Sequence, residues 1–172
     1  NPRYDWDLAL GGGIPIDLGV KLGSGSASVR LAETQLTALA AQAGSGQVAV
    51  ALGDQSDLRD VALKSGSGRL DLTMHGDCPR LAEVKMKNAS GMTVLALEGN
   101  YPSLERVALS SASGQVDVAL PGTFPQLQQV EARVASGVLN FDLADIACSS
   151  LDLSLDCVSG EIVLRYPTGI GI

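Results

Sequence analysis

Ser-Gly pairs recur along the chain, in segments such as GSGSAS and AGSGQV that look like glycine-rich phosphate loops. A phosphate loop needs a following Lys-Ser/Thr pair and a helix N-terminus, and neither segment offers them. A nucleophilic serine would stand in a G-x-S-x-G turn, which the sequence lacks. We therefore interpret the Ser-Gly pairs as structural turns and assign no catalytic role to their serines.

Three aspartates, Asp71, Asp117 and Asp142, are the best candidates for acid–base chemistry. Two carboxylates on opposite sides of a glycosidic bond can hydrolyse it. No basic or aromatic sugar-binding platform accompanies these aspartates, so a carbohydrate-active enzyme is the least favoured function, and we predict no enzyme activity. His75, the only histidine, has no nucleophile nearby and is interpreted as a solvated residue.

The three cysteines, Cys78, Cys148 and Cys157, have no CxxC partner and no metal-ligand spacing. We predict no metal and no cofactor. Cys78 is expected three repeats away from Cys148, which is too far for a disulfide. A bond between Cys148 and Cys157 is left open, with buried free thiols as the default.

The Ser-Gly pairs stand 21 to 23 residues apart, and this period is the strongest signal in the sequence. A flexible linker has no reason to keep such a period, whereas stacked structural repeats do. Glycine at each turn allows a positive φ. The predicted turn ladder consists of Ser24, Gly25, Ser45, Gly46, Ser67, Gly68, Ser90, Gly91, Ser113, Gly114, Ser136, Gly137, Ser159 and Gly160.

Each turn is followed by a strand whose apolar residues alternate strictly, such as Val48, Val50 and Leu52. A Gly-x-x-x-x-Leu corner and a shorter alternating strand then lead to the next turn. This pattern predicts an all-β fold, a β-solenoid (β-helix) of about six to seven coils. A meander of hairpins could also alternate, but nothing in it would hold the register.

We predict one domain in three parts. Residues 1–22 form N-terminal capping strands in a hairpin-like arrangement, residues 23–167 form the solenoid repeats, and residues 168–172 form a C-terminal tail. The open strand edge of the last coil is expected to lack a cap and so to contact a partner, a further domain or another copy.

Three features of the outer faces are candidate binding surfaces. A flat strip of small residues, here called the small-residue face, is a candidate protein-interaction face: Ala51, Thr73, Ala96 and Ala119. A basic stripe could contact anionic lipid or an acidic partner: Lys64, Lys85, Lys87 and Arg133. Glu83 and Arg106 are expected to form an ion pair between neighbouring repeats.

Composition excludes several classes of function. The formal net charge of −7 argues against nucleic-acid binding, because neutralising phosphates needs a basic surface. No apolar run reaches the length of about 20 residues that a membrane-spanning helix requires. Because the chain begins NPRYDW without Met, we expect it to lack its native N-terminus.

The segment YDWDLALGGGIPIDLGVKLGSGSASVRLAETQLTALAAQAGSGQVAVAL, residues 4–52, resembles the start of a bacterial toast-rack domain. Such domains occur in LiaF-like proteins of the cell-wall-active-antibiotic response, and relatives occur in adhesin-like surface proteins. The resemblance implies a non-enzymatic module that is extracytoplasmic or membrane-associated at the bacterial cell envelope. It also implies a role in sensing wall or membrane stress through protein partners. A self-assembling or adhesin-like surface scaffold is the alternative function.

Overall fold

The computed structural model describes residues 13–32 and 34–167, and the described part contains strands and no helix. Seven long strands and two short ones form a single sheet system. Their bounds are β1 (Ile16–Leu31), β2 (Leu36–Leu52), β3 (Asp60–Asp77), β4 (Glu83–Asn100), β5 (Arg106–Ala119), β6 (Gly122–Thr123), β7 (Gln129–Asp142), β8 (Ile146–Ala147) and β9 (Asp152–Arg165).

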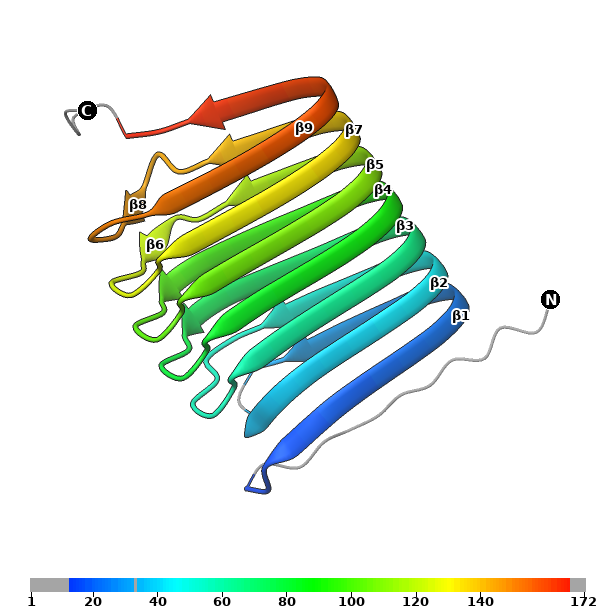
Figure 1. Ribbon diagram of the computed structural model, residues 1–172. Helices are drawn as coiled ribbons and strands as arrows, with labels where there is room; N and C mark the ends of the chain where they lie inside the picture. Colours follow the sequence, from blue (N-terminus) through cyan, green and yellow to red (C-terminus); the bar gives the residue numbers. More distant parts are fainter. Residues whose placement is uncertain (1–12, 33, 168–172) are drawn as a thin grey trace.

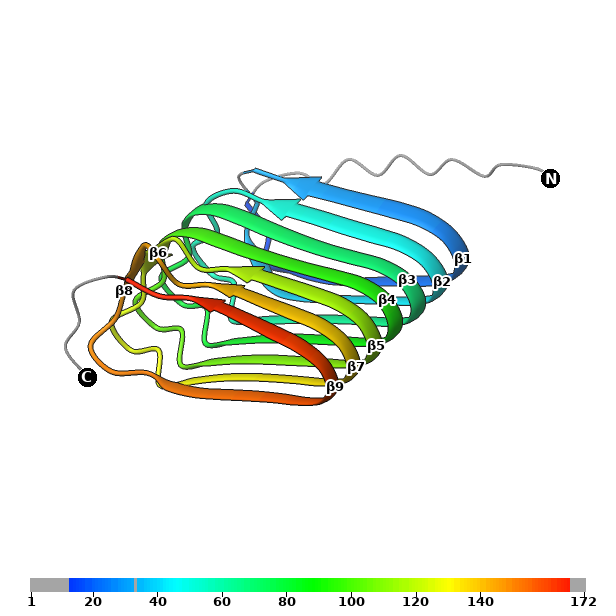
Figure 2. The same ribbon diagram turned by 90° about the horizontal axis from the view of Figure 1, so that it is seen from above.

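Each long strand bends back on itself at its Ser-Gly turn, so that its two arms lie in two facing layers (Figures 1 and 2). We call the part before the turn the first arm and the part after it the second arm. The long strands stack in the order β1-β2-β3-β4-β5-β7-β9. The short strands β6 and β8 continue the second-arm layer beside the end of β4.

Every pairing between neighbouring strands is parallel, and it holds one register through the stack. A meander of hairpins would pair its strands antiparallel, so this alternative is excluded. The predicted β-solenoid, with a repeat of about 23 residues, is therefore confirmed.

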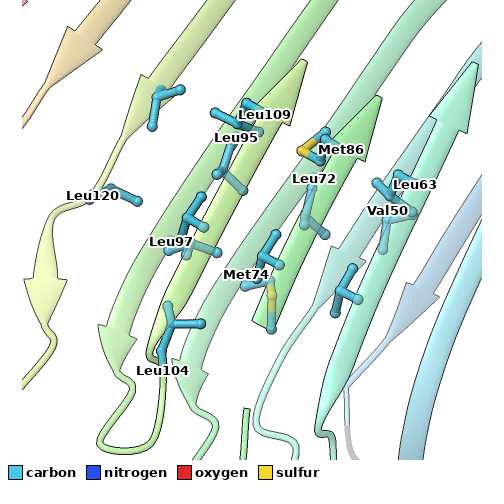
Figure 3. Close-up of a cluster of buried hydrophobic side chains, with 14 of the residues drawn as sticks. Val50, Leu63, Leu72, Met74, Met86, Leu95, Leu97, Leu104, Leu109 and Leu120 are labelled. Atoms are coloured by element: carbon cyan, nitrogen blue, oxygen red, sulfur yellow. The ribbon is translucent and has the colours of Figure 1, made fainter. Parts of the chain in front are cut away.

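The core lies between the two layers, because the apolar residues of both arms point inward at every second position. In β4, Met86 on the first arm and Leu95 and Leu97 on the second arm are buried. Figure 3 shows these side chains among leucines and methionines from the neighbouring coils. Aliphatic side chains of similar size in each coil let one coil pack directly on the next.

The predicted N-terminal cap falls partly outside the described residues, which begin at residue 13. The strand expected after the glycines begins at Ile16 and runs into β1, and from Asp17 onward its register with β2 matches that of the later coils. Residues 16–22 are thus the first arm of the first coil. The predicted tail, residues 168–172, lies outside the described residues.

The expected ion pair between Glu83 and Arg106 is wrong, although the register does place the two residues side by side. Glu83 instead pairs with Lys85 on its own strand at 2.5 Å. Arg106 pairs with Glu131 on β7 at 3.0 Å. Both cations are long side chains on an exposed face, where several carboxylates lie within their reach.

Candidate interaction surfaces

All seven Ser-Gly pairs stack into one ladder, with serine beside serine and glycine beside glycine. Each ladder glycine has a positive φ, between 112° at Gly25 and 146° at Gly160. A Cβ on Gly114 would lie 1.8 Å from the carbonyl oxygen of Gly91 in the coil before it. Glycine is therefore required both by the backbone conformation and by the close stacking of the turns.

The side-chain hydrogen bonds at two of these turns come from serines outside the predicted turn ladder. Ser65 and Ser111 each stand two residues before a ladder serine and face the core. Their hydroxyl groups donate to the carbonyl oxygens of Ser67 and Ser113, in both cases at 3.1 Å. Their position next to the ladder was the only signal that could have identified them.

The three candidate catalytic aspartates lie on the outer face of the second arms, and each is held by a neighbouring side chain. Asp71 pairs with Arg69 at 2.7 Å, and Asp142 pairs with Arg165 at 3.7 Å. Asp117 accepts hydrogen bonds from Gln115 at 2.8 Å and Asn140 at 2.7 Å. Asp71 and Asp117 are two coils apart, with Val94 between them in the register.

The small-residue face forms a continuous column on the same layer, because Ala51, Thr73, Ala96 and Ala119 are successive partners in the register. A shallow depression of about 370 Å³ lies over the later part of this column. Ala96, Ala119 and Asp142 contribute to its lining. The polar groups of its lining come from residues beside the column, which include Asp117, Asn140 and Arg165.

The basic stripe lies on the outer face of the first arms and is less uniform than the sequence suggests. Lys64 and Lys87 are register partners and form no ion pair with any described residue. Lys85 is engaged by Glu83 at 2.5 Å, and Arg133 by Glu131 at 2.6 Å. Lys64 and Lys87 are therefore the two residues of the basic stripe that are available to contact an anionic partner.

The corners of successive coils place one residue each in a buried column. Gln55, Cys78, Tyr101 and Phe124 occupy equivalent positions, because each backbone N–H donates to the strand of the next coil. The rings of Tyr101 and Phe124 stack with their centroids 5.3 Å apart. The Tyr101 hydroxyl donates to the carbonyl oxygen of Met74 at 3.1 Å.

The cysteines are all free. Cys78 is buried in the corner column, whereas Cys148 and Cys157 are half-buried near the C-terminal end of the stack. Among the described residues, no cluster of three or more His, Cys, Asp or Glu side chains could hold a metal ion. His75 pairs with Glu98 at 2.9 Å on the surface, and both side chains are exposed.

Burial in the corner column predicts a loss of stability at alkaline pH. It raises the pKa of the Cys78 thiol from 9.0 to about 11 and also raises the pKa of Tyr101. Above pH 9 the unfolded chain loses the Cys78 proton before the folded chain does. The free energy of unfolding is therefore highest below pH 9 and decreases between pH 9 and about pH 11. The loss from Cys78 is about 2–3 kcal/mol, and Tyr101 adds to it above its ordinary pKa.

Urea unfolding measured at about pH 8 and about pH 11 checks this expectation, with Cys78→Ala as the comparison. The variant should lose less stability between the two pH values than the unmodified protein. An equal loss in both proteins would show that Cys78 does not carry the effect.

The last coil differs from the inner coils because the inner faces of its arms are uncovered. Leu139 and Phe141 in β7 are buried, whereas their register partners in β9, Ile162 and Leu164, are 42% and 39% exposed. Tyr166 after β9 is 60% exposed. Val158 is 80% exposed at an outward position of the turn, whose equivalents Ala112 and Ala135 are exposed in the inner coils as well. Within the described residues β9 pairs only with β7, so its other edge has unpaired backbone groups.

Taken together, the fold defines a class: a β-solenoid repeat protein whose coils are held in register by a ladder of Ser-Gly turns. Residues 1–73 match the family described as the N-terminal domain of toast_rack, DUF2154. This match over the first 73 residues supports the toast-rack resemblance, and the family suggests a non-enzymatic repeat module. No curated protein and no solved structure matches the chain. In the described part of the chain, no helix is long and apolar enough to cross a membrane.

Proposed function

We propose that this chain is a protein-interaction module of the bacterial cell envelope that acts by contact and not by catalysis. The observation that carries the proposal is the terminal coil β9, where an unpaired strand edge coincides with four exposed apolar side chains. Exposed apolar groups that gather at one place are typical of sites that bind other proteins. The envelope location and a role in wall or membrane stress sensing are part of this proposal and follow from what the resemblance to toast-rack domains implies.

The chemistry of the contact follows from the geometry of β9. A strand that pairs with its free edge would satisfy the unpaired backbone N–H and C=O groups. Apolar residues at every second position of that strand would cover Ile162 and Leu164, as β9 itself covers the inner residues of β7. The partner is therefore expected to contribute an extended segment of alternating apolar residues.

The outer face of the second arms supports contact over catalysis. Asp117 is held by Gln115 and Asn140, and Asp71 by Arg69. These contacts give both carboxylates structural partners on the sheet face. Neither aspartate lies beside a histidine, because the single His75 pairs with Glu98.

Site-specific photo-crosslinking in the cells that make the protein tests this proposal. A photoreactive residue at Val158, in the terminal coil, should crosslink to a protein of the envelope fraction. The same residue at Ser110, exposed on an inner coil, is the matched control and should give little product. Leu164→Lys should abolish the Val158 product and weaken the cell's response to a cell-wall-active antibiotic.

Two results would contradict the proposal. One is equal crosslinking at positions 158 and 110, which would mean that β9 is not a preferred contact. The other is an unchanged product and an unchanged antibiotic response in Leu164→Lys, provided that the circular dichroism spectrum shows the variant to be folded.

A further inference from the structure

We propose that the partner of β9 is the first coil of a second copy of this chain, so that copies join head to tail. This inference rests on the proposed function, because it names the partner of the same coil. Strands β1 and β9 stand at opposite ends of the stacking order (Figure 1). Within the described residues β1 pairs only with β2, as β9 pairs only with β7.

The turn ladder restricts what can stack on β9. A Cβ on any of the six later ladder glycines would lie 1.8 or 1.9 Å from the carbonyl oxygen of the glycine in the coil before it. A coil added after β9 must therefore carry glycine where its turn meets Gly160. An arbitrary strand of a partner protein does not meet this requirement, because other residues have a Cβ and avoid a positive φ.

The first coil of this same chain does meet the requirement. Gly25 already has the ladder conformation, with a φ of 112°. A Cβ on Gly25 would have nothing within 4 Å in the single chain. Gly25 therefore already has the conformation needed to stack on Gly160 of another copy. Within its own copy, no described residue stacks on the outer side of Gly25.

The same register brings apolar residues together across the joint. Continuing the observed pairing by one step places Leu155 beside Val20, and Leu164 beside Val29. All four residues point toward the core layer and are only partly covered in the single chain. The joint would bury them as the inner coils bury their equivalents, and burial of apolar surface is the main driving force of association.

Charges at the rim of the joint are mixed. The exposed Asp156 would lie beside Lys21, which is favourable, whereas Arg165 would lie beside Arg30 and Asp152 beside Asp17. Exposed charges contribute little to association compared with buried apolar contacts. The joint should therefore depend on the turn and the core residues, and the rim charges should only adjust its strength.

This joint continues the stacking direction of the coils, so copies would add one after another into a linear assembly and not close into a ring. Its average mass would rise with protein concentration. A closed dimer would instead stop at twice the mass of 17.7 kDa.

Sedimentation velocity of the full chain over a series of concentrations tests the proposal. The unmodified protein should show a mass that increases with concentration beyond that of a dimer. Gly25→Ala should remain monomeric, because the new Cβ collides with the neighbouring copy and with nothing described in its own. Gly23→Ala is the matched control and should assemble, since three of the later coils carry alanine at the equivalent position: Ala89, Ala112 and Ala135.

The rim pair gives a second test that leaves the fold of the single chain unchanged. Lys21→Asp and Asp156→Lys should each weaken the assembly by about two- to fivefold, and the double variant should recover it. Full recovery is expected only if Lys21 of one copy meets Asp156 of another.

The proposal is overturned if the unmodified protein stays monomeric at all concentrations, or if Gly25→Ala assembles as the unmodified protein does. A monomeric protein whose Val158 still crosslinks specifically to a different envelope protein would overturn the head-to-tail joint and leave the proposed function standing. Absence of any specific Val158 product would overturn the proposed function as well.

Discussion

Gly114→Ala is expected to destabilise the solenoid by more than about 4 kcal/mol, or to prevent folding. Gly114 is in the middle of the turn ladder and has a φ of 121°. An alanine held there costs about 1–3 kcal/mol in backbone strain alone. Its Cβ would in addition lie 1.8 Å from the carbonyl oxygen of Gly91, so the two coils must move apart or unfold.

Gly25→Ala is the matched control for this prediction, because Gly25 is the same kind of residue in the same ladder. Its φ of 112° imposes the strain, but its Cβ would contact nothing within 4 Å. Urea unfolding of dilute samples followed by circular dichroism should show a loss of about 1–3 kcal/mol. If Gly114→Ala loses no more stability than Gly25→Ala, close stacking of the turns does not hold the coils together.

Tyr101→Ala is expected to lower stability by about 3–5 kcal/mol, the usual cost of removing a large buried ring. Tyr101 is fully buried in the corner column and stacks on Phe124. Without the ring, a cavity would open in the corner column between Cys78 and Phe124.

Tyr101→Phe separates the contribution of the ring from that of the hydroxyl group. The variant keeps the stacked ring and loses the hydrogen bond to the Met74 carbonyl oxygen, so about 1–2 kcal/mol should be lost. Thermal or urea unfolding of the three proteins gives both values. Equal losses in the two variants would mean that the hydrogen bond, and not the packing of the ring, stabilises the corner.

The fold could be predicted from the sequence because each coil lies directly on the previous one. Because the coils stack, equivalent positions hold similar residues. The Ser-Gly period and the alternating apolar residues after each turn therefore predict the β-solenoid. Val48, Leu70 and Val116 are examples of inward positions that were predicted and are buried. The same period placed Cys78 in the corner position that Tyr101 and Phe124 share.

Side-chain partners on the exposed faces could not be predicted in the same way. The register places Glu83 beside Arg106, but a cation on a flexible chain can reach any of several nearby carboxylates. Arg106 lies instead against Glu131, which also binds Arg133. The two amides that hold Asp117 were missed for the same reason, since the period fixes the backbone and not the direction of long polar side chains.

The terminal coil was predicted to have an open strand edge, and within the described residues β9 pairs only with β7. The exposed fraction of the inward side chains of this coil could not be predicted from the sequence, because it depends on which residues pack against them. The four exposed apolar side chains of this coil make it the strongest candidate contact in the described part of the chain.

Hydrogen–deuterium exchange at increasing protein concentration shows which coils make the contact. The amides of β9 (Asp152–Arg165) and β1 (Ile16–Leu31) should become protected together as concentration rises, while β4 (Glu83–Asn100) should not change. Exchange in β9 that stays independent of concentration while an inner coil gains protection would contradict this prediction. The solenoid would then meet its partner through a face and not through its open end.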